Sequence, residues 1–154
     1  MHILIKSTVA LTLMINQASA LSCTAIDMAS SYAKVAESST SYVILSGTFK
    51  FATRPEAGET PREEKFLTQF SGKLLTSDGF TDEVAGPVTI HTTCQASWCG
   101  KMTPDTPYLA FVEQDQTRLN LMVGPCPQTA FFEPTQEMLD EIVACAQGGD
   151  CAVN

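Results

Sequence analysis

The sequence predicts a mainly β domain, a small antiparallel barrel with one helix before the strands and one after them. Three observations favour this fold. About five segments have strand patterns, two segments repeat apolar residues every three or four positions, and the helical segments lie at the two ends of the chain. A parallel α/β sheet needs helices between its strands, so this order favours an antiparallel sheet closed on itself.

Both predicted helices have one apolar face. In residues 25–37 the apolar side chains recur at steps of three and four, at Ile26, Ala29, Tyr32, Ala33 and Ala36. A second helix begins after Pro134, where Thr135 is a suitable N-cap, and Gly148-Gly149 ends it. Its apolar face consists of Met138, Leu139, Ile142, Val143 and Ala146. We therefore expect each helix to pack through a single face.

The strand segments are separated by recognisable turns. Strand patterns cover residues 42–51, 66–76, 87–93, 108–112 and 118–123. We expect the first strand to bend or bulge at Gly47, Asp78-Gly79 to form a turn, and residues 113–117 to join the last two strands as a hairpin. Residues 54–65 contain Pro, Gly and Glu but no large apolar side chain, which predicts a solvated loop.

Composition and charge limit the classes of function. The 154 residues are 44% hydrophobic and 17% charged, which is typical of a folded chain rather than a disordered one. The nine Lys and Arg residues are spread along the chain and the formal net charge is −8, so the basic patch of a nucleic-acid binder is missing. No segment is long and apolar enough to span a membrane. We expect neither a nucleic-acid partner nor a membrane span.

Residues 1–20 have the features of a secretory signal peptide. They contain Lys6, an apolar run over residues 8–15, and the small residues Ala18 and Ala20 before the cleavage point. Residues 21–154 would then form a single secreted or periplasmic domain. A lipoprotein signal ending at Cys23 is the competing interpretation, but the large aliphatic residue usual three positions before a lipidated cysteine is absent.

All six cysteines follow the predicted signal peptide, and export would place them in an oxidising compartment. Three disulfides are therefore expected. The short separations favour pairing Cys94 with Cys99 and Cys145 with Cys151. Cys23 then pairs with Cys126, with Cys99 as its alternative partner.

Two local motifs are similar to catalytic motifs, and both are incomplete. Residues 96–102, around Cys99, are similar to the active-site turn of thioredoxin-like oxidoreductases, but Met102 replaces the resolving cysteine. Ser31 and Lys34 match the S-x-x-K pattern of penicillin-recognising enzymes, but the other motifs of those enzymes are absent. We interpret Ser31 and Lys34 as surface residues of the first helix.

The remaining titratable residues do not form a recognisable site. His91, the one histidine after the predicted cleavage point, alternates with Val88 and Ile90 and is expected on the polar face of its strand. The acidic residues lack calcium-loop spacing, and a zinc site is disfavoured because the cysteines are expected to be oxidised. We therefore expect no catalytic residue, no metal site, no cofactor and no enzymatic activity.

The order of features along residues 21–150 has a family resemblance. The chain has Cys23, a helical stretch, a strand over residues 42–49 and Phe70-Ser71-Gly72-Lys73, and the second half continues with residues 88–92, Cys99-Gly100, residues 108–112 and Cys126. This order resembles the netrin-like domains of tissue inhibitors of metalloproteinases, especially their bacterial relatives. The resemblance implies a five-stranded antiparallel OB-type barrel with an N-terminal and a C-terminal helix and with disulfides that fasten the N-terminus.

The resemblance also implies a role for the N-terminus. In the animal inhibitors the first residue is a cysteine whose α-amine and carbonyl chelate the zinc of the target protease, and the matching residue is Cys23. Cleavage after Ala20 would leave Leu21 and Ser22 ahead of Cys23, and Ala25 replaces the second cysteine of the family pattern. Cleavage after Ser22 would make Cys23 terminal.

The expected function is therefore that of a non-catalytic module that binds a protein partner. Leu21, Ser22 and Cys23 are its candidate contact residues, and a protease is one candidate partner. Two alternatives stay open: inhibition of a metalloproteinase through the Cys23 region, and a thiol oxidoreductase that uses Cys99.

Overall fold

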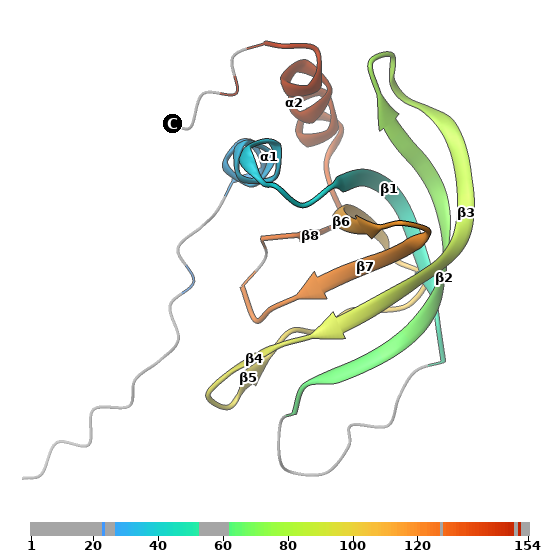
Figure 1. Cartoon of the computed structure of the whole chain (residues 1–154), viewed down its shortest axis with the longest axis vertical. Coiled ribbons are helices and arrows are strands. Elements are labelled where there is room, and N and C mark those ends of the chain that lie inside the picture. Colours follow the sequence, from blue (N-terminus) through green and yellow to red (C-terminus); the bar gives the residue numbers. More distant parts are fainter. Residues whose placement is uncertain (1–22, 24–26, 53–61, 127, 150, 152–154) are drawn as a thin grey trace, which may run out of the picture.

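The computed structural model describes residues 23, 27–52, 62–126, 128–149 and 151. These residues form a mainly β fold with two helices that lie side by side at one end of the sheet (Figure 1). The elements in chain order are α1 (Met28–Glu37), β1 (Tyr42–Lys50), β2 (Glu64–Thr76), β3 (Gly79–Thr92), β4 (Cys94–Gln95), β5 (Trp98–Cys99), β6 (Pro107–Asp115), β7 (Arg118–Val123), β8 (Ala130–Phe132) and α2 (Gln136–Ala146).

Five strands are linked in a cycle of pairings. β1 pairs with β2 and β6, β2 with β3, and β6 with β7, all antiparallel, and β3 pairs with β7 in parallel. The expectation that all strands are antiparallel is wrong for β3 and β7. The reason is topological, because strand directions cannot alternate all the way around a cycle of five.

Three short strands were not predicted from the sequence. β8 pairs with β6, and β4 pairs with β5 in a separate two-stranded sheet. β4 and β5 have two residues each and β8 has three, which is too short for an apolar period to be visible. The five longer strands contain the five predicted strand segments almost completely.

Two apolar clusters lie on the two faces of β1 and β6. Inside the cycle, Phe49 and Phe70 pack with side chains from β3, β6 and β7, namely Val88, Ile90, Tyr108, Val112 and Leu121. On the outer face, α1 and α2 cover a second cluster of Met28, Ile44, Leu109, Phe111, Phe131 and Ile142. β6 is therefore buried on both faces, and residues 108–112 are all buried.

The β2–β3 hairpin is longer than predicted. β3 begins at Gly79 rather than near Pro87, and β2 includes Glu64 and Lys65, which were assigned to the solvated loop. Residues 54–61 of that loop lie outside the described residues. The outward side chains of β2 are exposed at Lys65, Leu67, Gln69, Ser71 and Lys73. The hairpin thus has one buried and one solvated face, as its alternating pattern indicates.

Gly47 allows a close strand approach rather than a bulge. The pairing register of β1 is continuous through Gly47 on both sides, with Gly72 directly opposite on β2. A Cβ atom on either glycine would lie 2.6 Å from the Cα of the other. The ring of Phe70 also lies against this pair, so no side chain fits at either position.

Each helix begins after an N-cap side chain, and a glycine with positive φ follows the second helix. Asp27 caps α1 by accepting a hydrogen bond from the Ser30 amide at 2.6 Å, which lowers the pKa of its carboxyl group. Thr135 caps α2 as predicted, and Gly148 follows the helix with a positive φ of 81°. Residues 25 and 26 of the predicted first helix lie outside the described residues.

The buried face of α1 differs from the predicted one. Met28, Ala29 and Ser31 are buried, whereas Ala36 is exposed. The interpretation of Ser31 as a surface residue is therefore wrong, because its position faces the packed side of the helix. Within the described residues, neither helix has the length and apolar composition needed to cross a membrane.

Candidate functional site

The six cysteines form three disulfides with the favoured pairing. Cys23 is bonded to Cys126, at a sequence separation of 103, and the short loops are closed by Cys94–Cys99 and Cys145–Cys151. The alternative pairing of Cys23 with Cys99 is wrong. Cys23 is exposed, so the first bond holds an exposed residue that precedes α1 against the segment that follows β7.

The second disulfide closes the short β4–β5 hairpin. Cys94 is directly opposite Cys99, and Gln95 is directly opposite Trp98. Ala96 makes the turn with a φ of 53°. Trp98, the single tryptophan of the chain, is 55% exposed. The hairpin thus presents an indole ring to solvent from a covalently closed loop.

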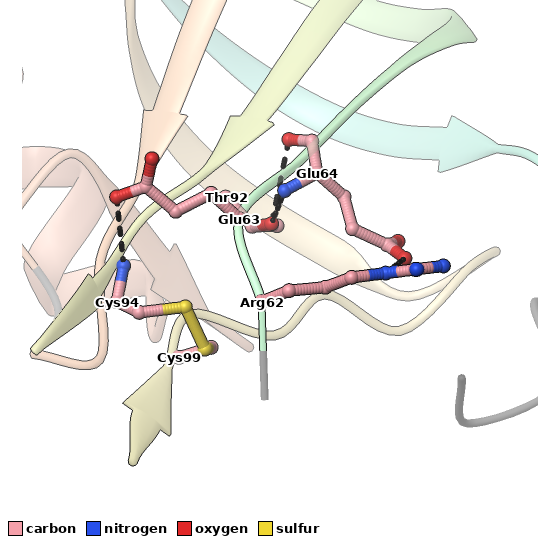
Figure 2. The surroundings of a disulfide bond; sticks show 6 residues. All are labelled: Arg62, Glu63, Glu64, Thr92, Cys94 and Cys99. Carbon is pink, nitrogen blue, oxygen red and sulfur yellow. Dashed lines mark hydrogen bonds and ion pairs between the residues drawn. A yellow bond between two sulfur atoms is a disulfide. The ribbon is translucent and has the colours of Figure 1, made fainter. Parts of the chain in front are cut away.

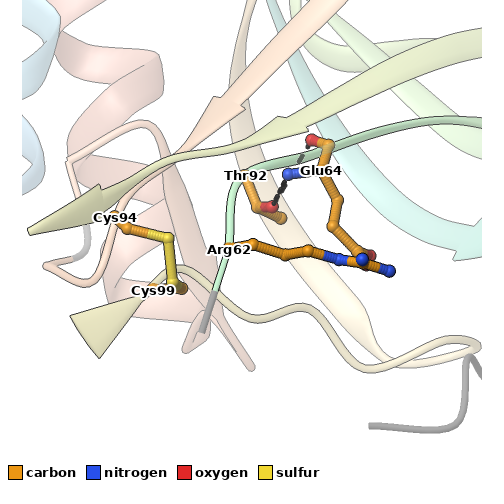
Figure 3. Close-up of polar contacts among 5 residues, drawn as sticks. All are labelled: Arg62, Glu64, Thr92, Cys94 and Cys99. Atoms are coloured by element: carbon orange, nitrogen blue, oxygen red, sulfur yellow. Dashed lines mark hydrogen bonds and ion pairs between the residues drawn. A yellow bond between two sulfur atoms is a disulfide. The ribbon is translucent and has the colours of Figure 1, made fainter. Parts of the chain in front are cut away.

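One hydrogen bond joins this hairpin to Glu63, just before β2, and another joins the first residue of β2 to the last residue of β3 (Figure 2). The Cys94 amide donates to a carboxylate oxygen of Glu63 at 3.5 Å, and the Glu64 amide donates to the Thr92 hydroxyl at 2.9 Å. The Arg62–Glu64 ion pair, at 3.5 Å, lies beside the Glu64–Thr92 contact (Figure 3). Since the Arg62 side chain is 65% exposed, the ion pair contributes little to the stability of this junction.

The residues that flank the β4–β5 hairpin pack on the end of β7. The Thr93 amide donates to the Val123 carbonyl at 2.9 Å, and the Gly100 amide donates to the Thr93 carbonyl at 3.0 Å. A Cβ atom on residue 100 would lie 2.5 Å from the Val123 carbonyl carbon. Gly100 is therefore required for this approach, and the hairpin is held in a defined place beside β7.

A groove of about 400 Å³ lies between the two disulfide-bonded segments. One wall includes Cys94 and Gln95 of the hairpin, and the other includes Cys126 and Gln128. The remaining lining residues are Thr93, Met122, Gly124, Pro125 and Thr129. The first wall is closed by the Cys94–Cys99 bond, and Cys126 in the second wall is bonded to Cys23.

The groove is lined by uncharged polar and apolar groups. No Asp, Glu, Lys or Arg is among its lining residues in the described part of the chain. Gln95 and Gln128 are exposed, and their side-chain amides make no hydrogen bond to another described residue. The Thr129 hydroxyl, in contrast, donates to the Met122 carbonyl. The two glutamines are therefore available to a ligand.

The candidate catalytic groups are not brought together. Lys34 is exposed and Ser31 is buried without a hydrogen-bond partner among the described residues, so the S-x-x-K pair does not form a dyad. Cys99 lies in a strand and is bonded to Cys94, not at a helix N-terminus where its thiol would be activated. His91 lies opposite the buried face of Val88 and Ile90, as predicted, and its Nε2 atom is buried without a partner among the described residues.

The groups with shifted pKa values lie away from the groove. Burial raises the pKa of Tyr42, and its hydrogen bond to the Glu113 carboxylate, at 3.0 Å, raises it further. Asp27, described above, caps α1. The described residues contain no group of three or more His, Cys, Asp or Glu side chains arranged to hold a metal ion.

The sequence interpretation identified part of this site. Cys23 lies beside the groove wall through its bond to Cys126, whereas Leu21 and Ser22 lie outside the described residues. Gln95, Gln128 and Thr129 were not singled out, because isolated uncharged polar residues carry no recognisable pattern. Trp98 was noticed only as part of the redox-like motif. Its exposure could not be predicted, because it depends on the β4–β5 hairpin, which was not predicted.

Comparisons of the chain with protein-family models, with curated proteins and with solved structures found no match.

Proposed function

We propose that the protein is a secreted or periplasmic module without catalytic activity that binds a protein partner through its N-terminal segment, Leu21, Ser22 and Cys23. The observation that carries this proposal is the Cys23–Cys126 disulfide, which holds an exposed N-terminal residue beside a braced groove. A contact residue that is already held in place, as Cys23 is by this bond, loses less conformational entropy on binding. The proposed partner contact is therefore the chain immediately around Cys23.

Three disulfides support the proposed location outside the cytoplasm, because such bonds persist in oxidising compartments. They also disfavour two alternatives. A lipid anchor on Cys23 would need the sulfur atom that is bonded to Cys126. A thiol oxidoreductase would need an activated thiol, and Cys99 is instead in the short hairpin disulfide.

The netrin-like relationship is part of the same proposal. An OB-type barrel has five strands in a Greek-key arrangement, and the cycle of β1, β2, β3, β7 and β6 supports this architecture. The disulfide that fastens the N-terminal cysteine supports the netrin-like relationship as well. Under this proposal α1 and α2 are the flanking helices of an OB-type domain spanning residues 21–154.

Metalloproteinase inhibition is the second candidate, and the exposure of Cys23 favours it. Cleavage after Ser22 would make the Cys23 amine terminal, next to its own carbonyl, as zinc chelation requires. Cleavage after Ala20 would displace that amine by two residues. We expect cleavage after Ala20, because Ala18 and Ala20 form the stronger peptidase signal.

The test is affinity capture by the mature, oxidised protein from the organism's own envelope and medium, with the N-terminus checked by sequencing. We expect a protein that is retained by the wild type, lost with Leu21→Asp and retained by the control Leu67→Asp, an exposed site on β2. Purified partner should show the same ranking by calorimetry. Equal retention by Leu21→Asp, or no retained protein, would contradict the proposal.

The same preparation tests the second candidate. A mature chain beginning at Cys23, together with zinc-protease inhibition that disappears when the α-amine is acetylated, would replace partner binding by inhibition. A chain beginning at Leu21 that does not inhibit zinc proteases agrees with our proposal.

A further inference from the structure

The groove lies beside the disulfide that fastens Cys23. The sulfur atom of Cys23 is bonded to Cys126 and lies 3.8 Å from the carbonyl oxygen of Pro125. Cys126 and Pro125 both line the groove, and the Cα atoms of Cys23 and Cys126 are 5.5 Å apart. Cys23 itself is exposed. This exposed residue therefore adjoins one wall of the groove.

The expected mature chain begins two residues before this bond. Cleavage after Ala20 leaves Leu21 and Ser22 ahead of Cys23. A chain spans at most about 3.3 to 3.6 Å per residue, so the Cα atom of Leu21 stays within about 7 Å of the Cα atom of Cys23. A segment tethered this closely has a high effective concentration at the groove, whereas a separate molecule must lose translational freedom to bind there. The mature N-terminus is therefore favoured over a second copy or a partner as the occupant.

The groove suits a short segment with an apolar side chain and no side-chain charge. Met122, Gly124 and Pro125 contribute apolar surface, and the described lining residues include no Asp, Glu, Lys or Arg. Burial of a leucine side chain against such surface is favourable. Pockets of about 300 to 1,000 Å³ hold drug-sized molecules, so a groove of about 400 Å³ has room for two residues.

The free polar groups of the groove suit the backbone of the same segment. Gln95 and Gln128 come from opposite walls, and their side-chain amides make no hydrogen bond to another described residue. Each amide both donates and accepts hydrogen bonds. A chain that begins at Leu21 supplies an α-amine, which donates, and the Leu21 carbonyl, which accepts. The two glutamines thus match the two polar ends of the first residue.

We propose that the mature N-terminus occupies this groove, with the Leu21 side chain against Met122 and Pro125. This inference rests on the proposed function and deepens it, because Leu21 becomes the residue that positions Ser22 and Cys23 for the partner. A contact segment that is held at Leu21 as well as at Cys23 loses less conformational entropy when the partner binds. Leu21→Asp then weakens partner binding by releasing the segment from the groove.

Nuclear magnetic resonance on the mature, oxidised protein tests this placement, after N-terminal sequencing has confirmed the start at Leu21. We expect nuclear Overhauser effects between the methyl groups of Leu21 and the methyl group of Met122, with the same relative intensity in dilute and concentrated samples. Leu21→Asp should abolish the contact, because a carboxylate is disfavoured in an uncharged groove. Leu21→Met, which keeps an apolar side chain, should retain it.

The side-chain amide signals of the glutamines give a second readout. In a chain that begins at Cys23, the signals of Gln95 and Gln128 should shift, because their bonds to the first residue are lost. The signal of Gln69, which is exposed on the outer face of β2, is the matched control and should not move. The dipeptide Leu-Ser-amide, added at millimolar concentration to this shortened chain, should return the two groove signals toward their positions in the mature protein.

Absence of the contact between Leu21 and Met122 would overturn the proposal, as would unchanged Gln95 and Gln128 signals in the shortened chain. A mature chain that begins at Cys23 would overturn it too. Overhauser effects between labelled and unlabelled molecules in a mixed sample would assign the groove to a second copy instead. Equal binding of the dipeptide by the mature and shortened chains would show that Leu21 leaves the groove empty.

Partner capture and the Overhauser contact are separate readouts. A partner that is retained by a protein without the contact between Leu21 and Met122 would leave the proposed function standing and overturn only this placement. The contact without any retained partner would support the placement of Leu21 and overturn the proposed function.

Discussion

Strands β6 and β2 belong to the same sheet and differ in their sequence patterns. In β6, residues 108–112 are all buried, because the inner cluster lies on one face and the helix-covered cluster on the other. In β2, buried or half-buried residues alternate with exposed ones from Lys65 to Lys73. We call the outer face of β1 and β6, with α1 and α2, the helix-covered region. We call β2 with β3 the hairpin region, which does not include the short β4–β5 hairpin.

The comparison shows what sets a strand's pattern. Both strands have the same backbone alternation, so the pleat alone gives them the same two faces. The difference comes from the helices, because Met28 of α1 and Ile142 of α2 pack on Leu109 and Phe111. Among the described residues, neither helix packs in this way on Leu67, which is 64% exposed. A continuous apolar run thus indicates a strand covered on both sides.

The largest expected effect on stability comes from removing the Cys23–Cys126 disulfide, which joins the residue before α1 to the segment after β7. Replacing Cys23 and Cys126 by serine should lower the free energy of unfolding by about 4 to 5 kcal/mol, because the bond closes a long loop in the unfolded chain. The matched pair Cys145→Ser and Cys151→Ser should cost about 2 kcal/mol. Urea unfolding measures both. Hydrogen exchange should rise more in α1 than in the hairpin region, and equal losses for the two pairs would contradict the loop-length argument.

Truncation of one side chain in each region tests the comparison directly. Phe111→Ala removes a ring that is 1% exposed from the helix-covered region and should cost about 3 to 5 kcal/mol. Leu67→Ala on the hairpin region should change stability by less than about 0.5 kcal/mol. The measurement is chemical unfolding of both variants. A large loss for Leu67→Ala would show that the outer face of β2 is covered in solution.

Two glycines of the hairpin region sharpen the comparison further. Gly72→Ala should cost about 2 to 3 kcal/mol, because its Cβ would collide with Gly47. Gly86→Ala has no atom within 4 Å of the added Cβ and should be neutral or slightly stabilising. Thermal unfolding of the two variants gives the difference. Similar melting temperatures would mean that β1 and β2 can separate at Gly47 without loss.

Much of the architecture was predictable from local chemistry. The alternation in β2, the apolar run in β6, the Thr135 cap and the stop at Gly148 are each visible within a few residues of sequence. The disulfide pairing also followed, since two short separations left one long pair. Apart from the long Cys23–Cys126 pair, which was left by elimination, these features depend on residues that are close together along the chain.

The groove was not predictable, because its walls come from segments that are distant in sequence. Gln95 and Gln128 meet across it only after the Cys94–Cys99 and Cys23–Cys126 bonds and the Gly100 contact with Val123 place both walls. The parallel pairing of β3 with β7 and the burial of Ser31 likewise depend on which elements pack together. The sequence by itself determined the two helices, the five longer strands, the cysteine framework and the Thr135 cap, because these follow mainly from local backbone and side-chain preferences. Only the tertiary structure decided which faces are covered and which free polar groups share a groove, because both depend on contacts between residues far apart along the chain.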